Sequence, residues 1–259
     1  MPFTTVLGHR LEYERIEATR PGLPPLVLLH EGLGSIALWK DFPQKLARAT
    51  GAQTTVFSRY GYGNSDPLAG RRGVDYMHRE GLEALPAFLD TLDIERPVLI
   101  GHSDGASIAL IHAGGTARPV AGLILEAPHV FVEDLTVDSI AQAKTVYETT
   151  DLARKLGRYH ADVDNVFWGW NDIWLDPAFR AWNIEEYLPA VTVPVLIIQG
   201  EDDEYGTVAQ CHAIEAEAGG PVETVLLPDC RHSPHRDQET ATLQAMTRFI
   251  SRLAEEQAA

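Results

Sequence analysis

The sequence has little cysteine and no long hydrophobic run. Its 259 residues include only Cys211 and Cys230, too few for a disulfide scaffold and not arranged as a CxxC pair. No run of 18 or more apolar residues is present, so no segment is long enough to cross a bilayer as a helix. Residues 1–13 lack the apolar core of a secretory signal. We therefore expect a soluble, cytoplasmic protein with reduced thiols.

Basic residues are also scarce. Lysine and arginine together number 21 against 37 aspartates and glutamates, which gives a net charge of −16. An acidic surface repels nucleic-acid phosphates and anionic lipid headgroups. We therefore expect neither nucleic acid nor a membrane as a partner.

Short apolar runs recur along the chain, each followed by a turn and a helical stretch. Runs this short and apolar predict strands buried on both faces, and their alternation with helices predicts an α/β fold with a mostly parallel, doubly wound sheet. The runs are residues 26–30, 54–58, 98–101, 123–126, 195–199 and 224–227. Residues 3–7 and 11–17 are expected to form an antiparallel hairpin at the sheet edge.

One long stretch interrupts this alternation. Residues 133–189 contain no strand-like run but hold four of the five tryptophans. Regular strand-to-helix connections are much shorter, so we expect an inserted helical cap over the carboxyl edge of the sheet. The predicted units are a core of residues 1–132 and 190–259 and a cap of residues 133–189. Candidates for a substrate pocket are Trp168, Trp170 and Trp174, unless the cap aromatics only pack the cap onto the core.

The most informative motif is Gly101-His102-Ser103-Asp104-Gly105, a G-x-S-x-G pattern between an apolar strand and a helix expected from residue 106 to 113. A sharp strand-to-helix turn would strain the backbone of Ser103 and expose its hydroxyl, while the two glycines let strand and helix pass closely. The backbone N–H of Asp104 would be free to bind an oxyanion. The motif therefore indicates a serine nucleophile.

A serine nucleophile needs a base and an orienting acid, which follow it in the order acid and then histidine on this topology. Asp203 follows a strand and is the expected acid, with Asp202 and Glu126 as alternatives. His232 is the expected base. His235 is the rival base, and we otherwise expect it to be a solvated or capping histidine.

Glycines also follow the first long strand, in the segment from residue 30 to 35. The N–H of Gly32 or of Leu33 is expected to complete, with that of Asp104, a two-donor oxyanion hole. Glu31 is unusual here, because its carboxylate would repel the developing charge unless it points away or bonds elsewhere.

Together these motifs resemble the α/β-hydrolase superfamily, in its capped, esterase-like branch. The matching segments are residues 30–35, 59–65, 101–105, 200–203 and 231–234. The sequence departs from the superfamily at Glu31, where glycine usually follows the histidine. The resemblance implies acyl transfer to water, with Ser103 as nucleophile, His232 as base and Asp203 as orienting acid, and with no metal or organic cofactor.

The expected function is hydrolysis of a small carboxylic ester, aromatic or cyclic in keeping with the cap aromatics. The resemblance also suggests carbon–carbon bond hydrolases of ring-cleavage products and enol-lactonases. A non-catalytic small-ligand receptor and a cofactor-free perhydrolase or lyase are more remote alternatives. A metal site at His232, His235 and Asp237 is disfavoured, because the chain has no tight His/Cys cluster. The expected partner is a small-molecule substrate, and a homodimer is left open.

Overall fold

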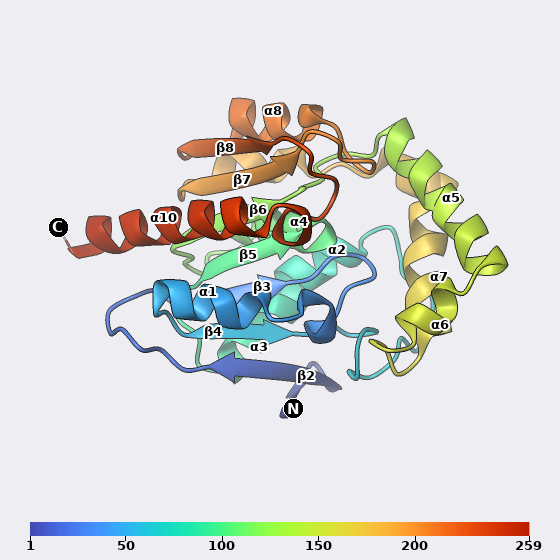
Figure 1. The fold of residues 1–259 in the computed structure, drawn as a ribbon, viewed down its shortest axis with the longest axis horizontal. Helices are drawn as coiled ribbons and strands as arrows, with labels where there is room; N and C mark the ends of the chain where they lie inside the picture. The colour runs from blue at the N-terminus through green and yellow to red at the C-terminus, as the bar shows by residue number, and fades with distance from the viewer. Residues whose placement is uncertain (259) are drawn as a thin grey trace.

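The computed structural model describes residues 1–258 and shows an eight-stranded sheet covered by helices (Figure 1). The strand order is β1-β2-β4-β3-β5-β6-β7-β8. Neighbours from β4 to β8 are parallel, and β1 and β2 form an antiparallel hairpin at one edge. The strands are β1 (Phe3–Val6), β2 (His9–Ile16), β3 (Leu26–Leu29), β4 (Thr54–Phe57), β5 (Val98–His102), β6 (Gly122–Glu126), β7 (Val195–Gly200) and β8 (Val222–Leu227). The predicted mostly parallel α/β fold is confirmed.

Two apolar cores lie on the two faces of this sheet, and the central strands feed both. In β3, Val27 and Leu29 belong to one core, while Leu26 and Leu28 belong to the other. Helices α1 and α10 cover one face, in front of the sheet in Figure 1. The helices of the core are η1 (Ile36–Trp39), α1 (Phe42–Thr50), α2 (Tyr76–Arg79), η2 (Glu80–Ala84), α3 (Leu85–Thr91), α4 (Asp104–Gly115), α8 (Val208–Glu217), α9 (Pro234–Asp237) and α10 (Glu239–Ala258).

The expectation that every apolar run is buried on both faces is wrong for β8. Only Leu227 of this strand is buried, and Glu223 and Leu226 are exposed. The reason is its place in the sheet, because β8 is an edge strand with a single neighbour, β7. Strands β3 to β7 are buried along their whole length.

Residues 133–189 lie between β6 and β7 in the sequence, and their helices stand beyond the strand ends, at the right of Figure 1. The helices are α5 (Asp134–Thr149), α6 (Leu152–Leu156), α7 (Val163–Trp174), η3 (Pro177–Ala181) and η4 (Glu185–Ala190). No strand of the sheet comes from this segment, although Asn183 forms an isolated bridge with Phe131. We keep the name cap for residues 133–189, and its assignment as a unit separate from the core stays a prediction.

Both cysteines are buried free thiols. Burial raises the pKa of Cys211 and of Cys230 to about 12, so both thiols are protonated near neutral pH. Among the described residues, no helix is long and apolar enough to cross a membrane.

Helix α4 is separated from β5 by Ser103 alone and packs closely on the sheet, with glycines where the backbones meet. A Cβ atom at Gly105 would lie 2.2 Å from the carbonyl oxygen of Leu29 in β3, and one at Gly101 would lie 2.3 Å from the carbonyl oxygen of Gly105. These contacts are with backbone atoms, which cannot move aside as a flexible side chain could. The turn between β5 and α4 therefore depends on both glycines.

Replacing Gly105 with alanine should destabilise the fold by about 1–3 kcal/mol, the usual cost of forcing extra atoms into a packed interior. The control is Gly70→Ala, because a Cβ at Gly70 would meet no atom within 4 Å. Denaturant unfolding of both variants measures the difference. Equal stability of the two variants would contradict this account of the turn.

Candidate active site

The backbone of Ser103 is held in a conformation that side-chain-bearing residues rarely adopt. Its φ is 53° and its ψ is −117°, at the junction between β5 and α4. Its N–H donates to the carbonyl of Glu126 in β6, with an N–O distance of 2.9 Å. The side chain is thereby presented at the carboxyl edge of the sheet, as the motif predicts.

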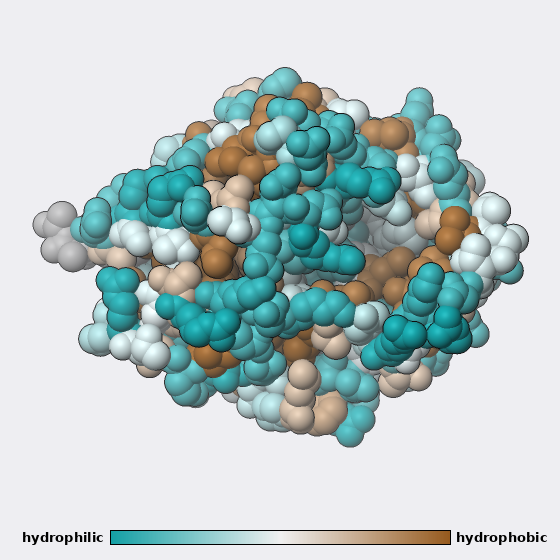
Figure 2. All heavy atoms as spheres, viewed as in Figure 1, coloured by the Kyte–Doolittle hydropathy of each residue, from teal (hydrophilic) through white to brown (hydrophobic). Residues whose placement is uncertain are grey.

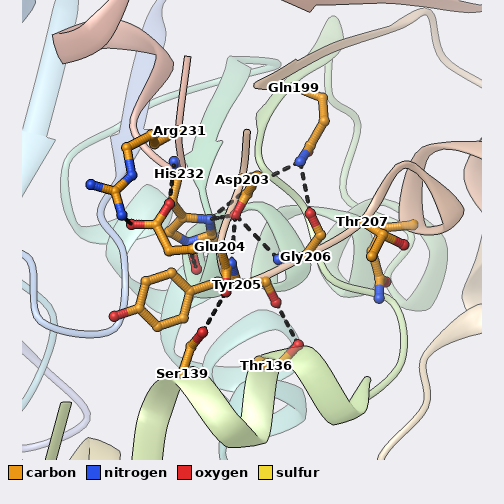
Figure 3. A network of polar contacts seen from close by, with 12 residues as sticks. Thr136, Ser139, Gln199, Asp203, Glu204, Tyr205, Gly206, Thr207, Arg231 and His232 are labelled. Atoms are coloured by element: carbon orange, nitrogen blue, oxygen red, sulfur yellow. Dashed lines mark hydrogen bonds and ion pairs between the residues drawn. The ribbon is translucent and has the colours of Figure 1, made fainter. Parts of the chain in front are cut away.

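Ser103, His232 and Asp203 are joined in one hydrogen-bonded chain. The hydroxyl oxygen of Ser103 lies 2.9 Å from Nε2 of His232, and Nδ1 of His232 lies 2.9 Å from both carboxylate oxygens of Asp203. Figure 3 shows His232 and Asp203 from close by, with the loop residues around them. Of the rival acids, Asp202 donates its backbone N–H to the carbonyl of Cys230, 2.9 Å away.

The loop after β7 surrounds the Asp203 carboxylate with hydrogen-bond donors. The carboxylate accepts hydrogen bonds from the side-chain amide of Gln199 at 2.8 Å and from the backbone N–H groups of Tyr205 and Gly206 at 2.8 and 3.2 Å. Burial alone would raise the pKa of Asp203, but His232 and the backbone N–H of Tyr205 hold it well below its usual range. Asp203 is therefore a carboxylate that can orient His232 and stabilise it when it is protonated.

The loop after β3, the strand that neighbours β5, presents free backbone donors. Residues 31–34 form a tight turn, closed by a 3.0 Å bond from the N–H of Gly34 to the carbonyl of Glu31. In the described chain, the N–H groups of Gly32 and Leu33 donate to no protein acceptor. Asp104 is the first residue of α4, where backbone N–H groups have no partner within the helix. These three groups are the ones predicted for an oxyanion hole.

His30 and Arg59 brace this turn from the core side. The carbonyl of Glu31 accepts bonds from Nδ1 of His30 at 2.7 Å and from the guanidinium of Arg59 at 3.1 Å. Nε2 of His30 in turn accepts the backbone N–H of Arg59 at 3.0 Å. Burial lowers the pKa of His30, so the ring is neutral with its proton on Nδ1.

The Glu31 carboxylate faces a histidine. Its Oε2 lies 3.4 Å from Nδ1 of His102, and Nε2 of His102 donates to the backbone carbonyl of His232 at 2.6 Å. Burial alone would lower the pKa of His102, but the contact with Glu31 raises it to about 9. The negative charge near the turn is therefore compensated by an imidazolium ion that also holds the backbone of His232.

A second buried pair involves the rival acid and the rival base. The carboxylate of Glu126 accepts the backbone N–H and the Nδ1–H of His235 at 2.9 and 2.8 Å. The expectation that His235 is solvated or caps a helix is wrong, because its side chain is 3% exposed. A carboxylate buried at the end of β6 needs a donor, and His235 supplies it. Glu126 thus serves His235 and not His232.

The three candidate pocket tryptophans, all on α7, lie in different surroundings. Trp170 lies over the turn, so close that a Cβ at Gly32 would be 2.2 Å from its indole nitrogen. Trp174 is buried edge-on against His129, with ring centres 5.5 Å apart, and His129 lies 5.6 Å from His232. Trp168 packs against Phe167 and lines a separate cavity of about 240 Å³ with Leu68 and residues 70–72. A role of any of them in binding stays a prediction.

The molecular surface is hollowed between the cap and the strand ends (Figure 2). Apolar side chains are visible around this hollow, whereas most of the face shown is hydrophilic. Ser103 is 7% exposed, so its hydroxyl is sheltered from bulk solvent.

The sequence of this chain matches the model of one known protein family. The model of the alpha/beta hydrolase family matches residues 26–245. The chain belongs to the alpha/beta hydrolase family. The resemblance seen in the motifs is thereby confirmed. No protein in the curated set matches the sequence.

Solved structures of other alpha/beta hydrolases share this fold along their whole length. The enol-lactonase from Burkholderia xenovorans is 19% identical, with a TM-score of 0.76, covering 96% of this chain and 100% of its own. A structure from work on carboxylesterases of Nitrososphaera gargenis is 18% identical, with a TM-score of 0.78 and coverage of 98% and 100%. The proline iminopeptidase of Mycobacterium smegmatis is 18% identical, with a TM-score of 0.77 and coverage of 98% and 99%. At these identities the likeness shows the fold alone.

The cap of this alpha/beta hydrolase is tied to the loop that carries Asp203, which the sequence did not reveal. On α5, the hydroxyl groups of Thr136 and Ser139 donate to the backbone carbonyls of Tyr205 and Glu204 (Figure 3). Neither residue stands out in the sequence, because no local pattern marks it. The loop around Asp203 is therefore held by the core and the cap together.

The alternative metal site is not assembled. His235 is directed to Glu126, while His232 faces Asp203 and Ser103. Across residues 1–258, no group of three or more His, Cys, Asp or Glu side chains is placed to hold one metal ion.

The Glu31–His102 pair predicts a specific dependence of stability on pH. Because the pKa of His102 is raised from 6.5 to about 9 and that of Glu31 is held below its ordinary 4.5, the stabilisation is complete between pH 4.5 and 6.5 and is lost as the pH rises through 9. The difference in unfolding free energy between wild type and Glu31→Gln, at most about 3 kcal/mol, should therefore shrink between pH 6.5 and 9. Denaturant unfolding at several pH values measures it. The control is Glu83→Gln, which removes an exposed pair with Arg79, and a pH-independent Glu31→Gln difference would contradict the assignment.

Proposed function

We propose that the protein is a serine hydrolase that cleaves a small carboxylic ester, aromatic or cyclic, through an acyl-enzyme on Ser103. The observation that carries the proposal is the chain of 2.9 Å contacts from the Ser103 hydroxyl through His232 to Asp203. Membership of the alpha/beta hydrolase family agrees with it.

In the acylation step, the hydroxyl oxygen of Ser103 attacks the ester carbonyl carbon and its proton passes to Nε2 of His232. Asp203 accepts the hydrogen bond from Nδ1–H and stabilises the imidazolium that forms. The carbonyl oxygen becomes an oxyanion, which receives the N–H of Asp104 and that of Gly32 or Leu33. The tetrahedral intermediate then collapses, and His232 protonates the departing alcohol oxygen.

Deacylation repeats these steps with water in place of Ser103. His232 takes a proton from the water, whose oxygen attacks the acyl carbon, and the same backbone N–H groups receive the second oxyanion. Collapse of this intermediate returns the proton to Ser103 and releases the carboxylic acid. Because Asp203 stays ionised throughout, His232 is held in one tautomer with Nε2 toward the serine.

The preference for an aromatic or cyclic substrate is supported by the cap. Trp170 lies over the turn that would receive the oxyanion, so one wall beside the reacting carbonyl is a flat apolar ring. A lactone is a cyclic ester and can undergo the same two steps. Lactone opening is therefore the second candidate.

Substitution of Ser103 or His232 by alanine should lower kcat by about 10³-fold or more, because both act in one unit. His235→Ala should instead lower stability, since it leaves Glu126 buried without its partner, and kcat of the folded protein should change little. Hydrolysis of p-nitrophenyl esters from acetyl to dodecanoyl, with phenylacetyl, benzoyl and lactone substrates, measures this. Turnover that survives in Ser103→Ala would overturn the proposal, and binding without turnover of any substrate would favour a receptor.

Asp203→Asn should lower kcat by about 10²–10⁴-fold, because an amide cannot stabilise the imidazolium or select its tautomer. Asp202→Asn is the matched control in the same loop and should keep nearly full activity. Steady-state kinetics on the best ester of the series compares the two. The reverse order of effects would move the orienting role to Asp202.

A further inference from the structure

His160 lies in the cap, just after α6, and its side chain is buried. In the sequence it is one of several histidines without a partner motif. In the structure both of its ring nitrogens bond to backbone groups of the core. One contact is with the loop after β4, and the other is with the turn of residues 31–34.

The two bonds fix the protonation state and orientation of the ring. Nδ1 lies 3.0 Å from the backbone nitrogen of Gly63, an N–H donor, so Nδ1 must be the unprotonated acceptor. The proton is then on Nε2, which donates to the carbonyl of Leu33 at 2.9 Å. Burial lowers the pKa of His160, which agrees with a neutral ring.

The contact with Gly63 anchors His160 to the core. The carbonyl of Gly63 accepts the backbone N–H of Ala161 at 2.8 Å, so the two cap residues take both backbone groups of this glycine. Gly63 has a φ of 58°, and a Cβ there would lie 2.1 Å from the carboxylate of Glu12. The loop is thus packed tightly, and it offers His160 a firm support.

The contact with Leu33 reaches the turn from the cap side. Arg59 and His30 hold the carbonyl of Glu31, at the start of the turn. Within the described chain, His160 makes the only side-chain hydrogen bond to the backbone of residues 32–34. This part of the turn carries the free N–H groups of Gly32 and Leu33.

We propose that His160 is a positioning residue, which fixes the Leu33 carbonyl and thereby aims the neighbouring N–H groups at the developing oxyanion. Oxyanion donors act because they are oriented in advance, and misplacement by about 1 Å can cost about 100-fold in rate. The cap therefore completes the oxyanion hole as well as covering it. This inference rests on the proposed function.

Trp170 supports the same conclusion by a different contact. Its ring lies over Gly32 from the cap, where no side chain would fit on the turn. The turn is thus bounded on the cap side by one hydrogen bond and one packed ring. A cap displaced from the core would release both restraints at once.

Two substitutions separate the two bonds of His160. In His160→Asn, the amide oxygen can take the place of Nδ1 and accept the N–H of Gly63, but nothing reaches Leu33. In His160→Gln, the amide nitrogen can take the place of Nε2 and donate to Leu33. We expect His160→Asn to lower kcat by about 10–100-fold with little change in KM, and His160→Gln to keep most of the activity.

Asn165→Ala is the matched control for cap docking. Asn165, on α7, also makes two bonds to the core, accepting the N–H of Leu68 at 2.9 Å and donating to its carbonyl at 3.0 Å. Its loss should lower stability as much as His160→Asn does while leaving kcat unchanged. Thermal unfolding of each variant accompanies the kinetics.

A trifluoromethyl ketone, which forms a tetrahedral oxyanion on the serine, gives a second readout. Its inhibition constant should rise in His160→Asn by the same factor by which kcat falls, whereas the product acid should bind as in wild type. Equal kcat losses in His160→Asn and His160→Gln, or in His160→Asn and Asn165→Ala, would overturn the inference. So would wild-type kcat in His160→Asn. Turnover in Ser103→Ala would instead overturn the proposed function.

Discussion

The strained backbone at Ser103 is the constraint on which the rest of the site depends. A residue held at φ 53° and ψ −117° costs on the order of 1–3 kcal/mol, and it persists only where the surroundings enforce it. Here β5 is buried along its whole length, and α4 starts at the next residue. Gly101 and Gly105 let the two elements approach until no Cβ would fit between them. The fold thereby fixes the serine hydroxyl, and the other groups are placed around it.

The second feature of this site is that the carboxylates of Glu31 and Glu126 are paired with histidines. The protein has a net charge of −16, and two of its carboxylates stand at the ends of the strands that flank β5: Glu31 follows β3 and Glu126 ends β6. Each carboxylate has a histidine partner, His102 for Glu31 and His235 for Glu126. A buried carboxylate without a partner would cost several kcal/mol and would also repel the oxyanion. The histidine partners therefore let an acidic chain carry carboxylates around the reacting atoms.

Local sequence patterns were sufficient to predict the sheet and the residues after its strands. Apolar runs followed by glycine mark strand ends, and parallel strands bring their carboxyl ends to one edge. Ser103, Asp203 and His232 were predicted in this way, since they lie one, three and five residues past the ends of β5, β7 and β8. The glycines of the motif around Ser103 also predicted the strained backbone of the serine and the close packing of strand and helix.

The contacts of His235, His160 and Trp168 could not be predicted, because they depend on tertiary packing. In the sequence, His235 looks like a polar residue at the start of a helix. Its burial is explained by the Glu126 carboxylate at the end of β6, which accepts its hydrogen bonds. His160 meets two loops about a hundred residues earlier in the chain. Trp168 shares α7 with Trp170 but turns to another side of the helix, which composition does not encode.

The most direct test of the account is mass spectrometry of the protein, quenched in acid during turnover of its best ester. We predict that one acyl group is attached to the chain, that peptide mapping places it on Ser103, and that it disappears once substrate is exhausted. Acylation of a different residue, or turnover without any acylated protein even with an ester whose acyl group is hydrolysed slowly, would contradict the account.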